Sequence, residues 1–184
     1  PQGTVPSYQL LFAGIWMGEF RYDIGLDTIS HEEYIQAKRE VFTTSGENPV
    51  FVYTHSSLPG HSQNSGICLS NEIEMYGEKL LNANLEMRED IAAIIANDPS
   101  AIVIVAGDHG PYLTKNCTQL RDNYDLAEIT RIDILDRHSS FLAIRWPTED
   151  YSEYDQITVL QDIFPAIFSW MYRDSTLLDA RIEP

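Results

Sequence analysis

The pattern of apolar and polar positions divides this chain into short apolar runs and helical segments. Residues 50–54 and 101–106 are compact, rich in β-branched residues and end abruptly in polar loops. Such runs are typical of buried strands. A third strand is predicted at residues 140–146, whereas the apolar run at residues 8–20 is compatible with a strand or a helix.

Helical patterns lie between these runs. Ser30, with Glu33 as its capping-box partner, predicts a helix that continues to Phe42. A longer helix is predicted from Asn71 to the stop at Asp98-Pro99, because apolar residues recur there at helical spacing. Further helices are predicted at residues 126–136 and 158–172.

The order of these elements predicts the fold class. A strand, a loop, a long helix and a second strand make a βαβ crossover, which implies parallel strands. We therefore expect an α/β fold with a mostly parallel sheet and helices on both faces. The length of 184 residues suits one domain, so we expect a single α/β unit over residues 1–184, with residues 1–7 flexible.

Candidate chemistry gathers in the loops after the two predicted strands. Asp108 and His109 follow Gly107 directly, and His55 and His61 lie in the loop after residues 50–54. Parallel strands would bring both loops to one edge of the sheet, where α/β proteins bind ligands. One carboxylate and one imidazole suit a divalent cation, although three or four ligands are usual.

Charge narrows the class of partner. The net charge of −16 disfavours binding to nucleic acid, and no Lys/Arg cluster points to an anionic membrane. No apolar run is long enough for a membrane span. The serine and threonine residues near the two loops lack the sequence frame of an activated nucleophile.

Several motifs occur in an order that resembles a known family. They are Phe51-Val-Tyr-Thr-His55 with Pro59-Gly-His61, Asp108-His-Gly-Pro111 after its strand, Phe141-Leu-Ala-Ile-Arg-Trp-Pro147, and Asp162-Ile-Phe-Pro165. Together they resemble the C-terminal half of the alkaline phosphatase/sulfatase superfamily, over roughly residues 28–172. The resemblance implies the C-terminal part of an alkaline-phosphatase-like fold.

The resemblance also implies roles for individual residues. Asp108 and His109 match a metal-binding pair, for Ca, Mg, Mn or Zn, that upstream residues would complete. His55 and His61 match catalytic histidines that contact the sulfate or phosphate group or the leaving oxygen. Lys115 either binds the anionic substrate or is a solvated surface charge.

The family's nucleophile and its acidic N-terminal metal ligand have no counterpart here. We therefore expect the C-terminal part of a metal-dependent sulfatase-like hydrolase or a phosphoryl or sulfuryl transferase, inactive alone, which acts on sulfate or phosphate esters of glycans or lipid headgroups. The alternative is a non-catalytic module with the sulfatase fold, used for binding or assembly.

The resemblance bears on location and on the two cysteines as well. Members of this family are commonly extracytoplasmic, and a periplasmic, surface or secreted location would permit a disulfide. Cys68 and Cys117 are expected at the same sheet edge, where they either form that disulfide or remain two separate buried thiols.

Overall fold

The structure is a computed structural model that describes residues 30–44, 50–62, 69–114 and 125–182. The chain divides into two compact units, Pro1–Val41 and Phe42–Pro184. Helix α2, His31–Thr43, makes up most of the described part of the first unit. The other described helices and strands belong to the second unit.

The predicted capping box at the start of α2 is confirmed. The amide of Ser30 donates a hydrogen bond to Glu33 Oε2 at 2.7 Å, and the amide of Glu33 donates one to Ser30 Oγ at 3.2 Å. These bonds satisfy backbone donors that the first turn of a helix leaves unpaired. They also lower the pKa of Glu33, because hydrogen bonds favour its charged form.

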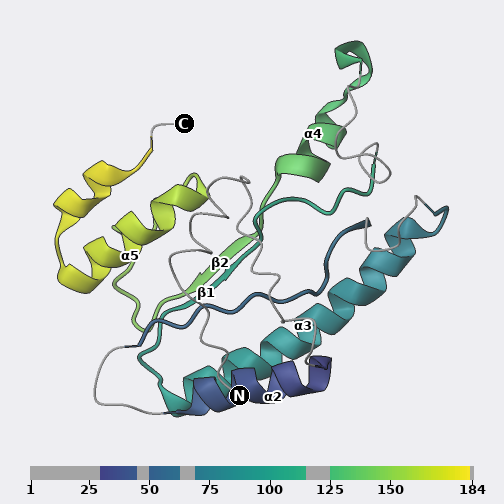
Figure 1. Ribbon diagram of the computed structural model, residues 1–184. Coiled ribbons are helices and arrows are strands. Elements are labelled where there is room, and N and C mark those ends of the chain that lie inside the picture. The colour runs from purple at the N-terminus through teal and green to yellow at the C-terminus, as the bar shows by residue number, and fades with distance from the viewer. Residues whose placement is uncertain (1–29, 45–49, 63–68, 115–124, 183–184) are drawn as a thin grey trace, which may run out of the picture. The chain divides into compact units, whose positions relative to one another are not determined.

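The predicted long helix is also confirmed, as α3, Glu72–Asn97 (Figure 1). The helix stops at Asp98, which has an extended backbone and whose carboxylate accepts hydrogen bonds from the amide and hydroxyl of Ser100 at 2.9 and 2.6 Å. Pro99 follows and disfavours a helical conformation at Asp98. None of the described helices combines the length and the apolar composition that a membrane crossing needs.

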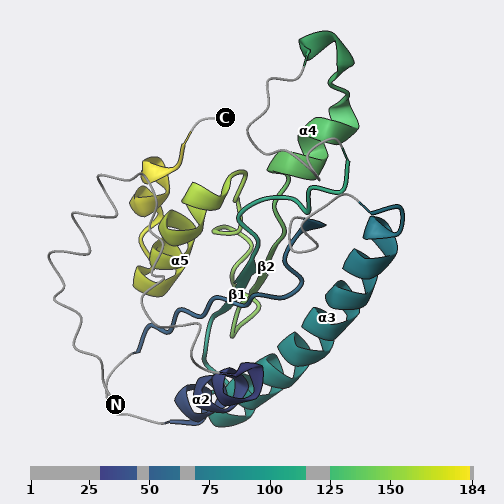
Figure 2. The same ribbon diagram turned by 45° about the vertical axis from the view of Figure 1, so that its right-hand side comes forward.

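The predicted fold, an α/β unit with a mostly parallel sheet, is wrong. Helices predominate, and the sheet formed by the described residues has two strands, β1 (Val103–Ala106) and β2 (Leu142–Arg145). The strands are antiparallel, with Val103 opposite Arg145 and Ala106 opposite Leu142. Figures 1 and 2 both show the two strands side by side.

The error arose at residues 50–54, which were predicted to form a buried strand. The segment is exposed and is not paired with any described strand, so α3 does not join two neighbouring strands of a sheet. β1 pairs instead with β2, which follows later and returns in the opposite direction. An apolar run indicates an extended backbone, but it does not specify which segment lies beside it or in which direction.

The helix predicted at residues 126–136 is divided in two. A short 3-10 helix, η4 (Leu126–Glu128), precedes α4 (Arg131–His138). Thr130 starts α4 because its side chain and that of Asp133 form a capping box, in which the Thr130 amide donates to Asp133 Oδ2 at 2.8 Å. The sequence contains this signal, a threonine followed three positions later by an acidic residue.

The C-terminal region is helical. The 3-10 helices η5 (Leu160–Asp162) and η6 (Ser175–Ala180) flank α5 (Ile163–Tyr172). Pro165 lies in the first turn of α5, where its missing N–H removes no hydrogen bond. The carboxylate of Asp162 is buried and accepts hydrogen bonds from the amides of Thr158, Val159 and Ile182 at 3.2, 3.3 and 3.0 Å.

The core of the second unit lies between α5 and the sheet. Trp146, Ile163 and Ile167 are buried at its centre. Partly buried side chains from β1 and the residue before it, from β2 and the loop after it, from η5 and from α5 itself pack against them: Ile102, Ile104, Leu142, Ile144, Tyr151, Ile157, Leu160 and Trp170. Burial of these side chains holds β1 in place and thereby positions the loop that follows it.

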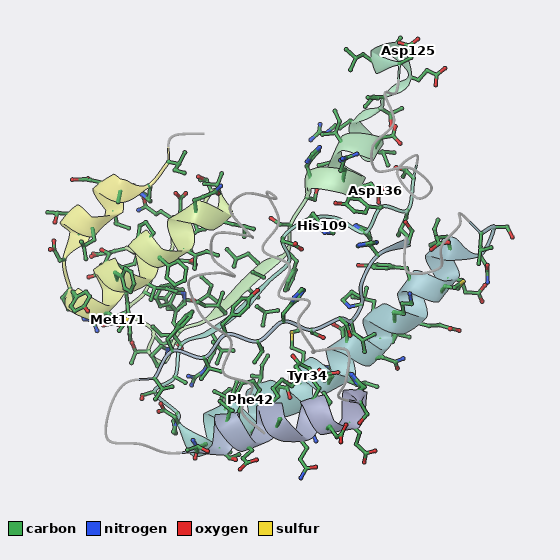
Figure 3. All side chains as sticks on the ribbon, in the orientation of Figure 1. Tyr34, Phe42, His109, Asp125, Asp136 and Met171 are labelled. Carbon is green, nitrogen blue, oxygen red and sulfur yellow. The ribbon has the colours of Figure 1, made fainter. Side chains whose placement is uncertain are left out.

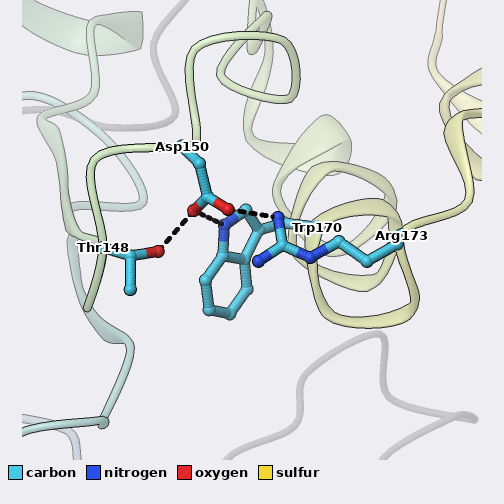
Figure 4. Close-up of polar contacts among 4 residues, drawn as sticks. All are labelled: Thr148, Asp150, Trp170 and Arg173. Carbon is cyan, nitrogen blue, oxygen red and sulfur yellow. Dashed lines mark hydrogen bonds and ion pairs between the residues drawn. The ribbon is translucent and has the colours of Figure 1, made fainter.

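Asp150 connects the loop after β2 to the end of α5 (Figure 4). Its carboxylate accepts hydrogen bonds from Thr148 Oγ1 and, at 3.2 Å, from Trp170 Nε1, and it forms an ion pair with Arg173 at 2.8 Å. Arg173 has a left-handed backbone, with a φ of 55°, and ends the helix. Since both charges are half-exposed, we expect this pair to contribute less than about 1 kcal/mol.

Candidate functional site

The loop after β1 lies against the end of α4. The amide of Gly107 donates to the carbonyl oxygen of Phe141 at 2.9 Å, and the amide of Gly110 donates to that of Arg137 at 3.1 Å. A Cβ atom on Gly110 would lie 2.6 Å from the carbonyl carbon of Asp136. Only glycine fits there, so the Asp108-His109 pair is followed by a residue that the packing requires.

Asp136 holds the far end of the same loop. Its carboxylate accepts hydrogen bonds from the amides of Leu113 and Thr114 and from Thr114 Oγ1, each at 2.9 Å. Figure 3 labels Asp136 on α4 and His109 on the loop after β1. Two groups of α4, the Arg137 carbonyl and the Asp136 carboxylate, thus accept four hydrogen bonds from residues 110–114. Asp136 was not among the predicted site residues.

Ser62 bonds the loop that contains His61 to the loop after β1. The Ser62 amide donates to the carbonyl oxygen of Pro111 at 3.1 Å, and its hydroxyl donates to the carbonyl oxygen of Tyr112. Ser62 is 2% exposed. These bonds place His61, the preceding residue, beside the loop that carries His109.

His61 and His109 therefore meet, as the sequence predicted, although not by way of parallel strands. Their ring centroids are 5.6 Å apart. The buried ring of Tyr112 contacts both: it stacks on His109 at 4.6 Å with an interplanar angle of 11°, and it lies 5.1 Å from His61. Tyr112 has a positive φ of 59°, and sequence reasoning did not single it out.

Asp108 and His109 are oriented as two donors for one ion. His109 Nδ1 lies 2.8 Å from the carbonyl oxygen of Gly110, which only accepts, so this contact favours a proton on Nδ1 and, in the neutral ring, leaves the Nε2 lone pair for a metal. Nε2 lies 3.7 Å from Asp108 Oδ2. A Zn²⁺ ion bonded to both at about 2.0–2.2 Å requires a separation below roughly 4.2 Å, so the pair fits a divalent cation.

This pair alone supplies two ligands. Among the described residues, no group of three or more His, Cys, Asp or Glu side chains is arranged to hold a metal ion. Asp108 has 88% of its side chain exposed and His109 35%, so both are accessible to further ligands. A catalytic metal with three or four ligands needs donors beyond these two.

Two cations lie near the histidines, together with the carboxylates of Asp108 and Asp136. The charge of Lys79, on α3, acts on His61, and the Arg137 guanidinium lies 6.0 Å from the centroid of the Tyr112 ring. Burial is the main cause of the lowered pKa of His61, and the charges of His109 and Lys79 lower it further, against the effect of Asp108. His61 is therefore neutral at pH 7. Sequence reasoning missed both cations, because each lies on a helix far from the loops in sequence.

Of the other predicted site residues, the structure describes His55 alone. His55 is exposed, and the ring contacts among His61, His109 and Tyr112 do not include it. Lys115, Cys68 and Cys117 lie outside the described residues. The substrate-binding role and the disulfide proposed for them stay predictions.

Comparison with known proteins finds no match for this chain, whether with a family model, a curated protein or a solved structure. The resemblance to the alkaline phosphatase/sulfatase superfamily therefore depends on the motifs in the sequence alone.

Proposed function

We propose that this chain is part of a metal-dependent hydrolase or transferase that acts on sulfate or phosphate esters. The observation that carries the proposal is the approach of His61 to His109, whose Nε2 lies 3.7 Å from Asp108 Oδ2. The resemblance of these motifs to the alkaline phosphatase/sulfatase superfamily supports the same reaction class.

Each residue has a distinct role in this proposal. Asp108 and His109 hold a divalent cation, and the carbonyl oxygen of Gly110 accepts a hydrogen bond from His109 Nδ1, which leaves Nε2 for the metal. Neutral His61 provides one donor and one acceptor nitrogen for an oxygen of the ester. Tyr112 stacks behind His109 and restrains its ring.

The substrate class follows from charge. The whole chain has a net charge of −16, which would repel a sulfate or phosphate ester. A bound divalent cation would supply positive charge and polarise the ester oxygen. Lys79 and Arg137 add positive charge on the same side as the histidines, which favours an anionic ligand over a neutral one.

Metal content tests the proposal. The full-length protein, stripped with chelator and reloaded with Zn²⁺, Mn²⁺, Mg²⁺ or Ca²⁺ in turn, should retain stoichiometric metal by mass spectrometry. Asp108→Asn and His109→Ala should each lose it, and Glu149→Gln, at an exposed carboxylate on another loop, should not. Retention by either site variant would exclude the assigned ligand role and leave an ion pair between Asp108 and protonated His109.

Activity distinguishes the two ester classes. The metal-loaded protein should hydrolyse either p-nitrophenyl sulfate or p-nitrophenyl phosphate, and His61→Ala should lower kcat by roughly 10²–10⁴-fold if its imidazole transfers a proton. A protein that binds metal stoichiometrically but cleaves neither ester would favour the binding or assembly role instead.

A further inference from the structure

Residues 50–54 form an extended segment whose backbone is unpaired in the described structure. No hydrogen bond joins their amides or carbonyl groups to another described residue. Val50, Phe51, Val52 and Tyr53 are nonetheless strong strand formers, and they are 73%, 73%, 40% and 78% exposed. An exposed row of unpaired N–H and C=O groups is a template for an added strand.

Three exposed rings on α5 continue this surface from Phe51. Together they form an aromatic row, which consists of Phe51, Phe164, Phe168 and Tyr172. The ring of Phe51 lies 6.2 Å from that of Phe164, and the following pairs along α5 are 5.8 and 6.4 Å apart. The three α5 rings are 46%, 44% and 70% exposed, whereas the opposite face of the helix is buried in the core. A helix that is apolar on both faces is normally covered on both.

Charge indicates what covers this surface. Two copies of the chain, each with a net charge of −16, would repel one another. Asp174 lies two residues after α5 and Asp179 lies on η6, whereas Arg173, which ends α5, is already paired with Asp150. The surroundings therefore favour an occupant with basic side chains.

We propose that residues 50–54 and the aromatic row bind an extended segment of a partner protein by strand addition. The segment has apolar side chains at alternate positions and lysine or arginine on either side of them. Its backbone pairs with residues 50–54, its apolar side chains cover the rings, and its cations lie near Asp174 and Asp179. This proposal does not depend on the proposed enzymatic function.

The probe for this surface is a fluorescent synthetic peptide with Val, Tyr and Val at alternate positions between two pairs of lysines. We expect saturable binding to the purified protein by anisotropy, and slower hydrogen exchange at the amides of residues 50–54. Phe51→Lys should weaken binding at least about tenfold, because it removes a central contact and adds a like charge. Leu126→Lys, at a residue 84% exposed on η4, should bind as the wild type does.

Other outcomes would overturn the proposal. These are no saturable binding, no change in exchange at residues 50–54, or equal binding of Phe51→Lys and the wild type. A peptide with glutamates in place of the lysines should bind much more weakly, and equal binding would refute the argument from charge. A wild-type dimer in sedimentation that Phe51→Lys dissociates would assign the surface to a second copy instead. Circular dichroism of the variants, both at exposed positions, checks that they are folded.

Discussion

The hydroxyl of Ser62 donates a hydrogen bond to the backbone carbonyl oxygen of Tyr112, which lies 50 positions further along the chain. The Ser62 amide donates a second bond, at 3.1 Å, to the carbonyl oxygen of Pro111. Ser62 is almost completely buried, so solvent does not compete for either bond. The approach of His61 to His109 therefore depends on this serine, which joins the two loops directly.

Replacing Ser62 should loosen the contact between the two histidines. Ser62→Ala leaves a buried carbonyl oxygen without its donor, so we expect the free energy of unfolding in urea to fall by about 1–3 kcal/mol. The ring-proton NMR signals of His61 and His109 should shift as their separation changes. Ser100→Ala removes an exposed hydroxyl bonded to Asp98 and should cost less than about 0.5 kcal/mol. Similar losses for the two variants would contradict this account.

Replacing each of two glycines by alanine should change the free energy of unfolding in opposite directions. Gly110→Ala should destabilise the protein by about 1–3 kcal/mol, because the new methyl group meets the backbone of Asp136. Gly77→Ala, within α3, has no atom within 4 Å of the new methyl group and should stabilise by about 0.5–1 kcal/mol. Urea unfolding measures both. A neutral Gly110→Ala variant would show that the loop after β1 is not held against α4.

Asp136 should contribute more to stability than Asp125, another carboxylate that accepts a backbone hydrogen bond. Asp136→Ala removes the acceptor of three hydrogen bonds from Leu113 and Thr114, and we expect it to cost about 2–3 kcal/mol. Asp125→Ala removes one exposed cap of η4, at Ala127, and should cost about 1 kcal/mol or less. Hydrogen exchange at residues 110–114 should accelerate in the first variant alone. Equal effects of the two substitutions would argue against a special role for Asp136.

Asp162 should make stability depend on acid pH. The hydrogen bond from the Ile182 amide, with those from Thr158 and Val159, holds the pKa of Asp162 below its ordinary value, against the effect of burial. A carboxyl whose pKa is lower in the folded state contributes stability that is present above its unfolded pKa of about 3.9 and lost as pH falls through its folded pKa. Asp162→Asn should therefore be less stable than wild type at pH 7, and this difference should shrink below about pH 4. Urea unfolding at pH 7, 4 and 2.5 measures it, and a difference independent of pH would refute the prediction.

Local signals predicted the helices well. Ser30 with Glu33, and Asp98 with Pro99, are cap and stop signals that act within a few residues, and the structure confirms both. The division between η4 and α4 was missed although Thr130 and Asp133 form the same kind of local box. Thr130 caps α4 with an extended backbone, so the 3-10 turn of η4 before it is a separate element.

The sequence did not predict which segments pair as strands. Residues 50–54 and 101–106 look alike in sequence, yet the first is exposed and unpaired within the described structure while most of the second forms β1. Strand propensity is a property of residues, whereas the partner and direction of a strand depend on segments far away in sequence. The parallel sheet was inferred from the order of predicted strands and helices along the chain, and that order does not determine the direction of pairing.

The sequence by itself determined the residue types of the candidate site and the helices that local caps define. Asp108, His109 and His61 were identified from their types and neighbours. Tertiary structure alone decided that Ser62 joins the two loops, that Tyr112 stacks on His109, and that Asp136 and Gly110 hold the loop against α4. The physical reason is distance along the chain: caps act within one helical turn, but the contacts of Ser62, Asp136 and Gly110 join residues more than 20 positions apart, and only the packed fold brings such residues together.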